Sequence, residues 1–105
     1  MINILIVEDD INLLNIINKN LEREGYIVYT ALDGVSGLEV FENNHIDLII
    51  LDLMLPKLDG YAFTKKIRNE KENLPIIMTT AKSLMEDKRI AFQTGVDDYM
   101  TKPLE

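Results

Sequence analysis

The feature that most constrains this chain is a short, unbroken apolar run, Leu48–Leu51, which ends abruptly in one acidic residue, Asp52. A strand buried on both faces of a parallel sheet has this continuous pattern. Ligands of open α/β sheets bind at the carboxyl ends of the strands, so we expect the Asp52 carboxylate at the mouth of a crevice. The alternative is that Asp52 is only a helix cap or a solvated loop residue.

A second apolar run, Ile4–Val7, has the same form and is followed at once by an acidic cluster, Glu8-Asp9-Asp10. Apolar residues then recur at spacings of three and four up to Glu24, which predicts a helix capped by one of the two aspartates. Two acidic groups that follow two buried strands favour a shared site at the same edge of a sheet.

The rest of the chain continues this alternation of strands and helices. Further strands are predicted at 26–30, 76–78 and 98–101, the first of them at a sheet edge, and further helices at 35–41, 61–69 and 84–94. The order indicates a parallel five-stranded sheet with helices on both faces, in the flavodoxin-like strand order 2-1-3-4-5. Pro56 and Gly60 turn the chain after Asp52, and Gly60 is expected to supply unusual backbone angles. His45 lies in a polar connection and is assigned no ligand role.

Length and charge narrow the function. A chain of 105 residues is expected to form one domain, and 11 basic against 18 acidic side chains give a net charge of −7. That charge argues against binding to nucleic acid or to an anionic membrane by this domain alone. The absence of cysteine and of a signal-like or membrane-length apolar segment predicts a cytoplasmic protein.

The strand ends together define a candidate site made of Glu8, Asp9, Asp52, Thr80 and Lys102. Converging carboxylates repel one another, and a divalent cation among them removes that repulsion. All-oxygen ligation suits Mg²⁺, and a carboxylate can attack a phosphoryl group to form an aspartyl phosphate. A lysine and a threonine can hold the remaining phosphate oxygens. Each residue also has a structural alternative, as a cap, a strand-end residue or a solvated charge.

Four segments in this order and spacing closely resemble the receiver domains of response regulators in two-component signalling. The resemblance extends over nearly the whole chain, and the segments that carry it are VEDD at 7–10, LDLMLPKLDG at 51–60, TTA at 79–81 and GVDDYMTKPL at 95–104. The sequences of these segments are most similar to those of receivers of the OmpR/PhoB type, which carry a C-terminal winged-helix DNA-binding domain.

The resemblance implies a role for each matching position. Asp52 becomes the phosphoacceptor, and Mg²⁺ is held by Asp9, by Glu8 through water, by Asp52 and by the backbone carbonyl of Met54. Thr80 and Lys102 are implied to bind the phosphoryl group, with Lys102 preceding a cis bond to Pro103, and Tyr99 to turn inward when Thr80 moves. The implied donor is a sensor histidine kinase, and the output is a conformational change rather than a reaction on another substrate.

The resemblance also implies parts that lie beyond residue 105. The family has a fifth helix after the Lys-Pro turn, so residues 1–105 are expected to form a receiver truncated before that helix, with an apolar surface left uncovered. Dimerisation, which this subclass achieves through the helix-4, strand-5 and helix-5 face, is expected to be impaired. DNA binding is expected only through a C-terminal domain absent from this chain.

Two other functions are compatible with part of this pattern. An aspartate-nucleophile phosphatase typically has a second aspartate two residues after the nucleophile, and that position here is Met54, which argues against turnover. A receiver-like interaction module that is never phosphorylated is opposed by the acidic pair together with Asp52, Thr80 and Lys102. Mg²⁺ binding separates the second rival from the phosphoacceptor.

Overall fold

The computed structural model describes residues 1–53, 55, 57–80 and 98–101, with residues 80 and 98–101 described by their backbone only. Strands and helices alternate along the chain as the apolar pattern predicts. The elements are β1 (Asn3–Val7), α1 (Ile11–Arg23), β2 (Ile27–Ala31), α2 (Gly34–Asn43), β3 (Leu48–Asp52), α3 (Gly60–Glu70), β4 (Ile76–Thr80) and β5 (Asp98–Thr101). The helix predicted at 84–94 lies outside the described residues.

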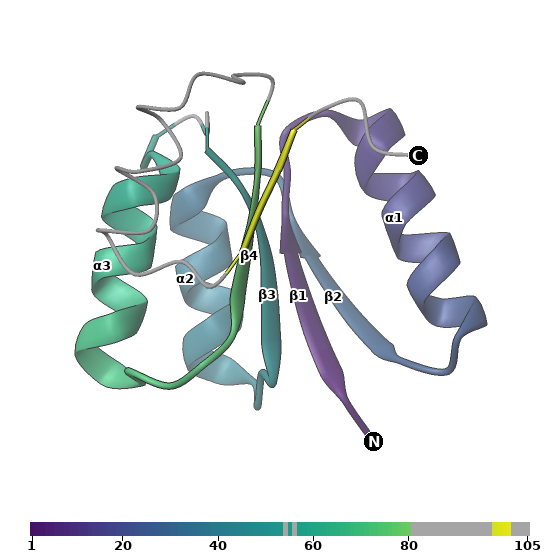
Figure 1. Cartoon of the computed structure of the whole chain (residues 1–105), viewed down its shortest axis with the longest axis horizontal. Helices are drawn as coiled ribbons and strands as arrows, with labels where there is room; N and C mark the ends of the chain where they lie inside the picture. Colours follow the sequence, from purple (N-terminus) through teal and green to yellow (C-terminus); the bar gives the residue numbers. More distant parts are fainter. Residues whose placement is uncertain (54, 56, 81–97, 102–105) are drawn as a thin grey trace.

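The strands form one parallel sheet in the order β2-β1-β3-β4-β5, and the predicted order of the first four strands, 2-1-3-4, is confirmed (Figure 1). β3 lies in the middle, with Val7 of β1 opposite its Leu51 and Thr79 of β4 opposite its Asp52. This register brings the carboxyl ends of β1, β3 and β4 to the same edge. β2 is an edge strand, as predicted.

Helices cover both faces of the sheet: α2 and α3 lie on one face and α1 on the other (Figure 1). The α2–α3 face holds the larger core, in which Phe63 and Ile67 of α3 are fully buried against the sheet. On the α1 face the fully or nearly buried apolar residues are Ile4, Ile6 and Leu14. The apolar stripe of each helix therefore faces the sheet, as its periodicity predicts.

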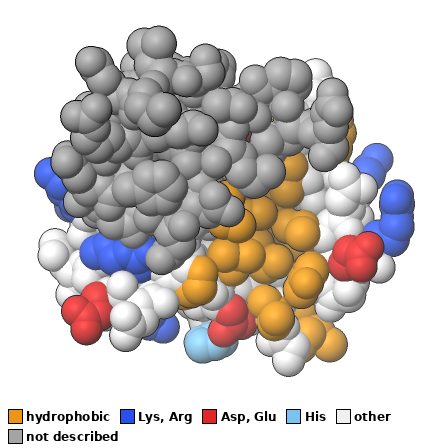
Figure 2. Space-filling view, in the orientation of Figure 1, with side chains coloured by type: hydrophobic (Ala, Val, Ile, Leu, Met, Phe, Trp, Pro, Cys, Tyr) orange, Lys and Arg blue, Asp and Glu red, His pale blue; other side chains and the backbone are white. Residues whose placement is uncertain are grey.

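The α1 face also contains an open apolar groove of about 510 Å³ between α1 and the sheet. Figure 2 shows hydrophobic side chains gathered there, and those that line the groove include Leu21, Tyr26, Leu48, Ile50, Pro75 and Ile77. An apolar surface of this kind in a small domain marks a place where another segment or molecule packs.

Arg68 donates hydrogen bonds from its guanidinium to the carbonyls of Leu74 and Lys71 and so ties the end of α3 to the start of β4. Gly60 is the first residue of a regular helix, and the glycine with a positive φ in the described ranges is Gly25, at +95° after α1. Among the described residues, no helix is long and apolar enough to cross a membrane.

Candidate functional site

Three carboxylates meet at the carboxyl edge of the sheet. Glu8 and Asp9 follow β1 and Asp52 ends β3, and each offers an oxygen within 4.8 Å of the oxygens of the other two. Glu8 and Asp52 are almost fully buried, at 2% and 3% exposure, whereas Asp9 is exposed. The two apolar runs therefore bring their acidic residues together, with Asp9 as the exposed member of the cluster.

The two aspartates after β1 have different tasks. Asp10 is the N-cap of α1: its Oδ1 accepts the backbone N–H groups of Asn12 and Leu13 at 3.0 and 3.2 Å. Glu8 Oε2 accepts the backbone N–H of Asp10 at 3.0 Å, which holds the turn between β1 and α1. With Asp10 used as the cap, Asp9 is the aspartate that faces the other two carboxylates.

The backbone beneath Asp52 is held on two sides. Leu53 donates its N–H to the carbonyl of Thr79 at 2.9 Å, and Gly60 donates its N–H to the carbonyl of Leu53 at 3.0 Å. A Cβ at position 60 would lie 2.7 Å from the Asp52 carbonyl oxygen, closer than real Cβ atoms approach. Gly60 is therefore required for close approach to the acidic strand end, rather than for unusual backbone angles.

The donor set suits Mg²⁺. All the candidate ligand atoms are carboxylate oxygens, which hard divalent cations prefer. Two atoms bound directly to Mg²⁺ at about 2.1 Å can be no more than about 4.2 Å apart. A spread of up to 4.8 Å is compatible with some direct ligands and one that binds through water.

The remaining predicted site residues lie wholly or partly outside the description. Met54 and Lys102 are not among the described residues, and Thr80 and Tyr99 are described only as backbone in β4 and β5. Thr80 and Tyr99 lie on neighbouring strands: Thr80 is paired with Thr101, and Tyr99 is paired with Met78. The roles assigned to these four residues stay predictions.

The strand order and the acidic cluster at the switch point between β1 and β3 place this chain among the doubly wound α/β domains, which bind ligands at that point. The family model for the response regulator receiver domain matches residues 4–105, which is nearly the whole chain. The chain belongs to the response regulator receiver domain family, and the resemblance found in its motifs is confirmed.

Relatives in sequence are longer proteins that are named as regulators. The alkaline phosphatase synthesis transcriptional regulatory protein PhoP of Bacillus subtilis is 48% identical over 100 residues, which are 95% of this chain and 42% of PhoP. The heme response regulator HssR of Staphylococcus epidermidis is 40% identical over 105 residues, which are 100% of this chain and 46% of HssR. The chain thus spans less than half the length of these relatives.

Solved structures agree with the fold. A two-component response regulator from Clostridium difficile matches with a TM-score of 0.96 at 30% identity, over 100% of this chain and 86% of that one. The receiver domain of a sensor histidine kinase from Pseudomonas aeruginosa matches with a TM-score of 0.88 at 36% identity, over 98% and 86% of the two chains. That second structure has a magnesium ion coordinated in its active-site cleft.

Proposed function

We propose that this domain accepts a phosphoryl group on Asp52 from the phosphohistidine of a sensor histidine kinase, with Mg²⁺ held in the acidic crevice. The observation that carries the proposal is the convergence of Glu8, Asp9 and Asp52 oxygens within 4.8 Å at the carboxyl edge of the sheet. Membership of the receiver family also supports Asp52 as the phosphoryl acceptor. Asp9 and Asp52 bind the ion directly, Glu8 binds it through water, and the Met54 carbonyl completes the protein ligands.

The transfer needs a nucleophile with a fixed position. One Asp52 carboxylate oxygen bonds to phosphorus while the bond from phosphorus to the donor histidine nitrogen breaks, and that nitrogen keeps the electron pair and takes up a proton from water. Mg²⁺ supplies positive charge beside the transferring oxygens. Burial of Asp52 on a central strand holds the attacking oxygen in place, so the chain promotes its own phosphorylation and dephosphorylation.

The output is a change of conformation. Thr80 and Lys102 bind the oxygens of the phosphoryl group, and Tyr99 turns inward when Thr80 moves onto it. Thr80 ends β4 and Tyr99 lies in β5, the strand paired with it, so a shift at one is transmitted to the other through neighbouring backbone. The two conformations are populated according to phosphorylation, which makes the domain a switch rather than an enzyme with an external substrate.

We propose that a fifth helix after residue 105 packs on the apolar groove beside α1. A C-terminal DNA-binding domain follows that helix in a cytoplasmic regulator that forms dimers in its active state. The 510 Å³ groove and the greater length of the curated relatives support this arrangement. A chain extended by that helix should remain monomeric and melt at a higher temperature than residues 1–105. Equal melting temperatures would contradict it.

The test of the phosphoacceptor is intact mass after incubation with a small phosphodonor and Mg²⁺. The unchanged chain should gain one phosphoryl group, and Asp52→Asn should gain none. Asp47→Asn makes the same substitution at the opposite edge of the sheet and should be phosphorylated like the unchanged chain. A gain in Asp52→Asn, or no gain in an unchanged chain that binds Mg²⁺, would overturn the proposal.

A further inference from the structure

The segment that follows Asp52 makes an unexpected contact with the start of α2. Lys57 Nζ lies 3.7 Å from Asp33 Oδ2, although the two residues belong to separate connections of the chain. The Asp33 side chain is mostly buried, at 14% exposure, while that of Lys57 is 67% exposed. The acidic partner is thus held by the fold, and the basic partner belongs to the loop between β3 and α3, residues 53–59.

Asp33 is held in place by contacts that do not involve Lys57. It is the N-cap of α2, where its Oδ1 accepts the backbone N–H of Ser36 at 2.8 Å and its Oδ2 accepts the Ser36 hydroxyl at 3.3 Å. The Ser36 backbone N–H is the main cause that lowers the pKa of Asp33, with a further contribution from Lys57. Asp33 therefore presents a charged oxygen to the β3–α3 loop at neutral pH.

Lys57 has a backbone conformation that needs support. Its φ is +69°, in the left-handed region, where a residue with a side chain is less stable by about 1 kcal/mol or more. The adjoining Leu58 packs so closely on Gly34 that a Cβ on that glycine would lie 2.7 Å from the Leu58 Cβ. The loop is thus seated on the amino end of α2 by an ion pair and by a steric fit.

The same loop returns directly to the acidic site. Its base is closed by the hydrogen bond from the Gly60 N–H to the Leu53 carbonyl, against the carbonyl of Asp52. Lys57 and Leu58, which contact α2, therefore belong to the same short connection as the Leu53–Gly60 hydrogen bond beside Asp52.

We propose that Lys57 is a positioning residue: its ion pair with Asp33 holds the β3–α3 loop in the shape that the acidic crevice needs to bind Mg²⁺. The inference rests on the proposed function of that crevice. Exposed ion pairs contribute little, so breaking this one should weaken Mg²⁺ binding by about two- to fivefold. The phosphorylation rate measured below saturating Mg²⁺ should fall by the same factor.

Whether Lys57→Gln weakens or strengthens Mg²⁺ binding distinguishes a positioning role from a simple effect of charge. Lys57→Gln removes a positive charge from the domain, which by simple electrostatics would strengthen Mg²⁺ binding. Asp33→Asn removes a negative charge and keeps a good N-cap, because asparagine caps helices as well as aspartate does. A positioning role predicts weaker binding in both variants and no further loss in the double variant, which has the net charge of the unchanged chain.

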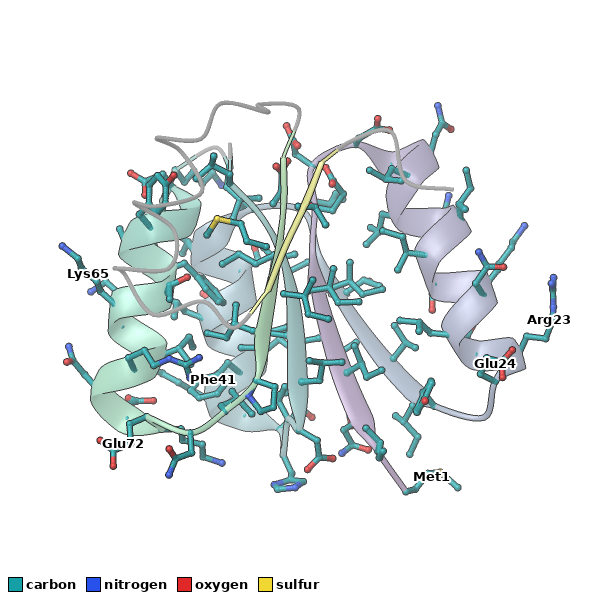
Figure 3. All side chains as sticks on the ribbon, in the orientation of Figure 1. Met1, Arg23, Glu24, Phe41, Lys65 and Glu72 are labelled. Carbon is teal, nitrogen blue, oxygen red and sulfur yellow. The ribbon has the colours of Figure 1, made fainter. Side chains whose placement is uncertain are left out.

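The experiment is calorimetric titration of Mg²⁺ into the unchanged chain, the two single variants and the double variant, at low and high salt. Lys57→Arg should restore the affinity, and the differences should shrink at high salt because the pair is exposed. Lys65→Gln is the matched control, since Lys65 points away from α3 into solvent (Figure 3).

The outcomes separate the two proposals. No Mg²⁺ binding by the unchanged chain would defeat the proposed function itself. Normal binding by the unchanged chain with equal or tighter binding by Lys57→Gln, or additive effects in the double variant, would overturn the role of Lys57 alone. Melting temperatures of all variants within a few degrees of one another would show that the loss of affinity is not loss of fold.

Discussion

The two edges of the sheet use the same residue type in opposite ways. At the amino edge, Asp47 accepts the Asn3 backbone N–H on Oδ2 and pairs with His45 Nε2 through Oδ1, both at 2.8 Å. The Asn3 side chain in turn donates to the His45 carbonyl at 2.8 Å. At the carboxyl edge, three carboxylates face one another within 4.8 Å. Hydrogen-bond donors contact both oxygens of Asp47, whereas the three carboxylates of the second group also face one another.

This difference teaches how to recognise a site among acidic residues. An aspartate whose oxygens accept local hydrogen bonds contributes to the fold, as Asp47 and the cap Asp10 do. Carboxylates that gather at the end of a buried strand repel one another, and a bound cation lowers that repulsion. The amino edge should therefore respond to loss of hydrogen bonds, and the carboxyl edge should respond to cations.

The largest expected effect is stabilisation by Mg²⁺. Because the ion binds the folded chain, a concentration of about 100 times the dissociation constant should add about 2.7 kcal/mol to the free energy of unfolding. Asp9→Asn should lose most of this gain, and Asp47→Asn should keep it. Thermal denaturation with Mg²⁺ and with a chelator measures both. An equal response to Mg²⁺ in Asp9→Asn and in the unchanged chain would contradict the assignment of the carboxyl edge.

A smaller effect of opposite sign is expected without metal. Asp9 is exposed and faces two buried carboxylates, so Asp9→Asn should relieve repulsion and raise the free energy of unfolding by about 0.5 kcal/mol. Denaturant titration in the presence of a chelator, at low ionic strength, gives this difference. The comparison between the edges would lose its electrostatic basis if Asp9→Asn were less stable than the unchanged chain under those conditions.

The parts of the fold that were predictable are those with a strong local pattern. The apolar runs before Glu8 and Asp52 predict β1 and β3, and the fixed hand and order of parallel folds bring their ends together. The convergence of Glu8, Asp9 and Asp52 follows from that topology, so these positions could be predicted without a structure.

The parts that were not predictable depend on contacts between loops. Neither the positive φ of Lys57 nor its pairing with Asp33 leaves a periodic pattern, because the partners lie 24 positions apart in irregular segments. Gly60 was singled out for the wrong reason, since a close approach to the Asp52 carbonyl cannot be read from a turn sequence. The sequence places His45 in a polar connection, and its pairing with Asp47 depends on the local conformation of the chain.

The smallest expected effect is a pH dependence at the amino edge. The Asn3 backbone N–H is the main cause that lowers the pKa of Asp47 below its ordinary value of 3.8, with His45 contributing further. A carboxyl whose pKa is lower in the folded chain adds stability above pH 3.8, and this contribution disappears as the pH falls through the lowered pKa. Asp47→Asn should therefore be slightly less stable than the unchanged chain at pH 7 and equally stable in strong acid.

Denaturant titration across that pH range tests this difference in stability, with Glu39→Gln, an exposed site on α2, as the control. A difference between Asp47→Asn and the unchanged chain that stays constant down to the lowest pH would mean that the charge of Asp47 adds nothing at this edge. The hydrogen bonds from Asn3 and His45 would then only hold the conformation of the Asp47 side chain. The electrostatic contrast between the two edges would depend on the carboxyl edge alone.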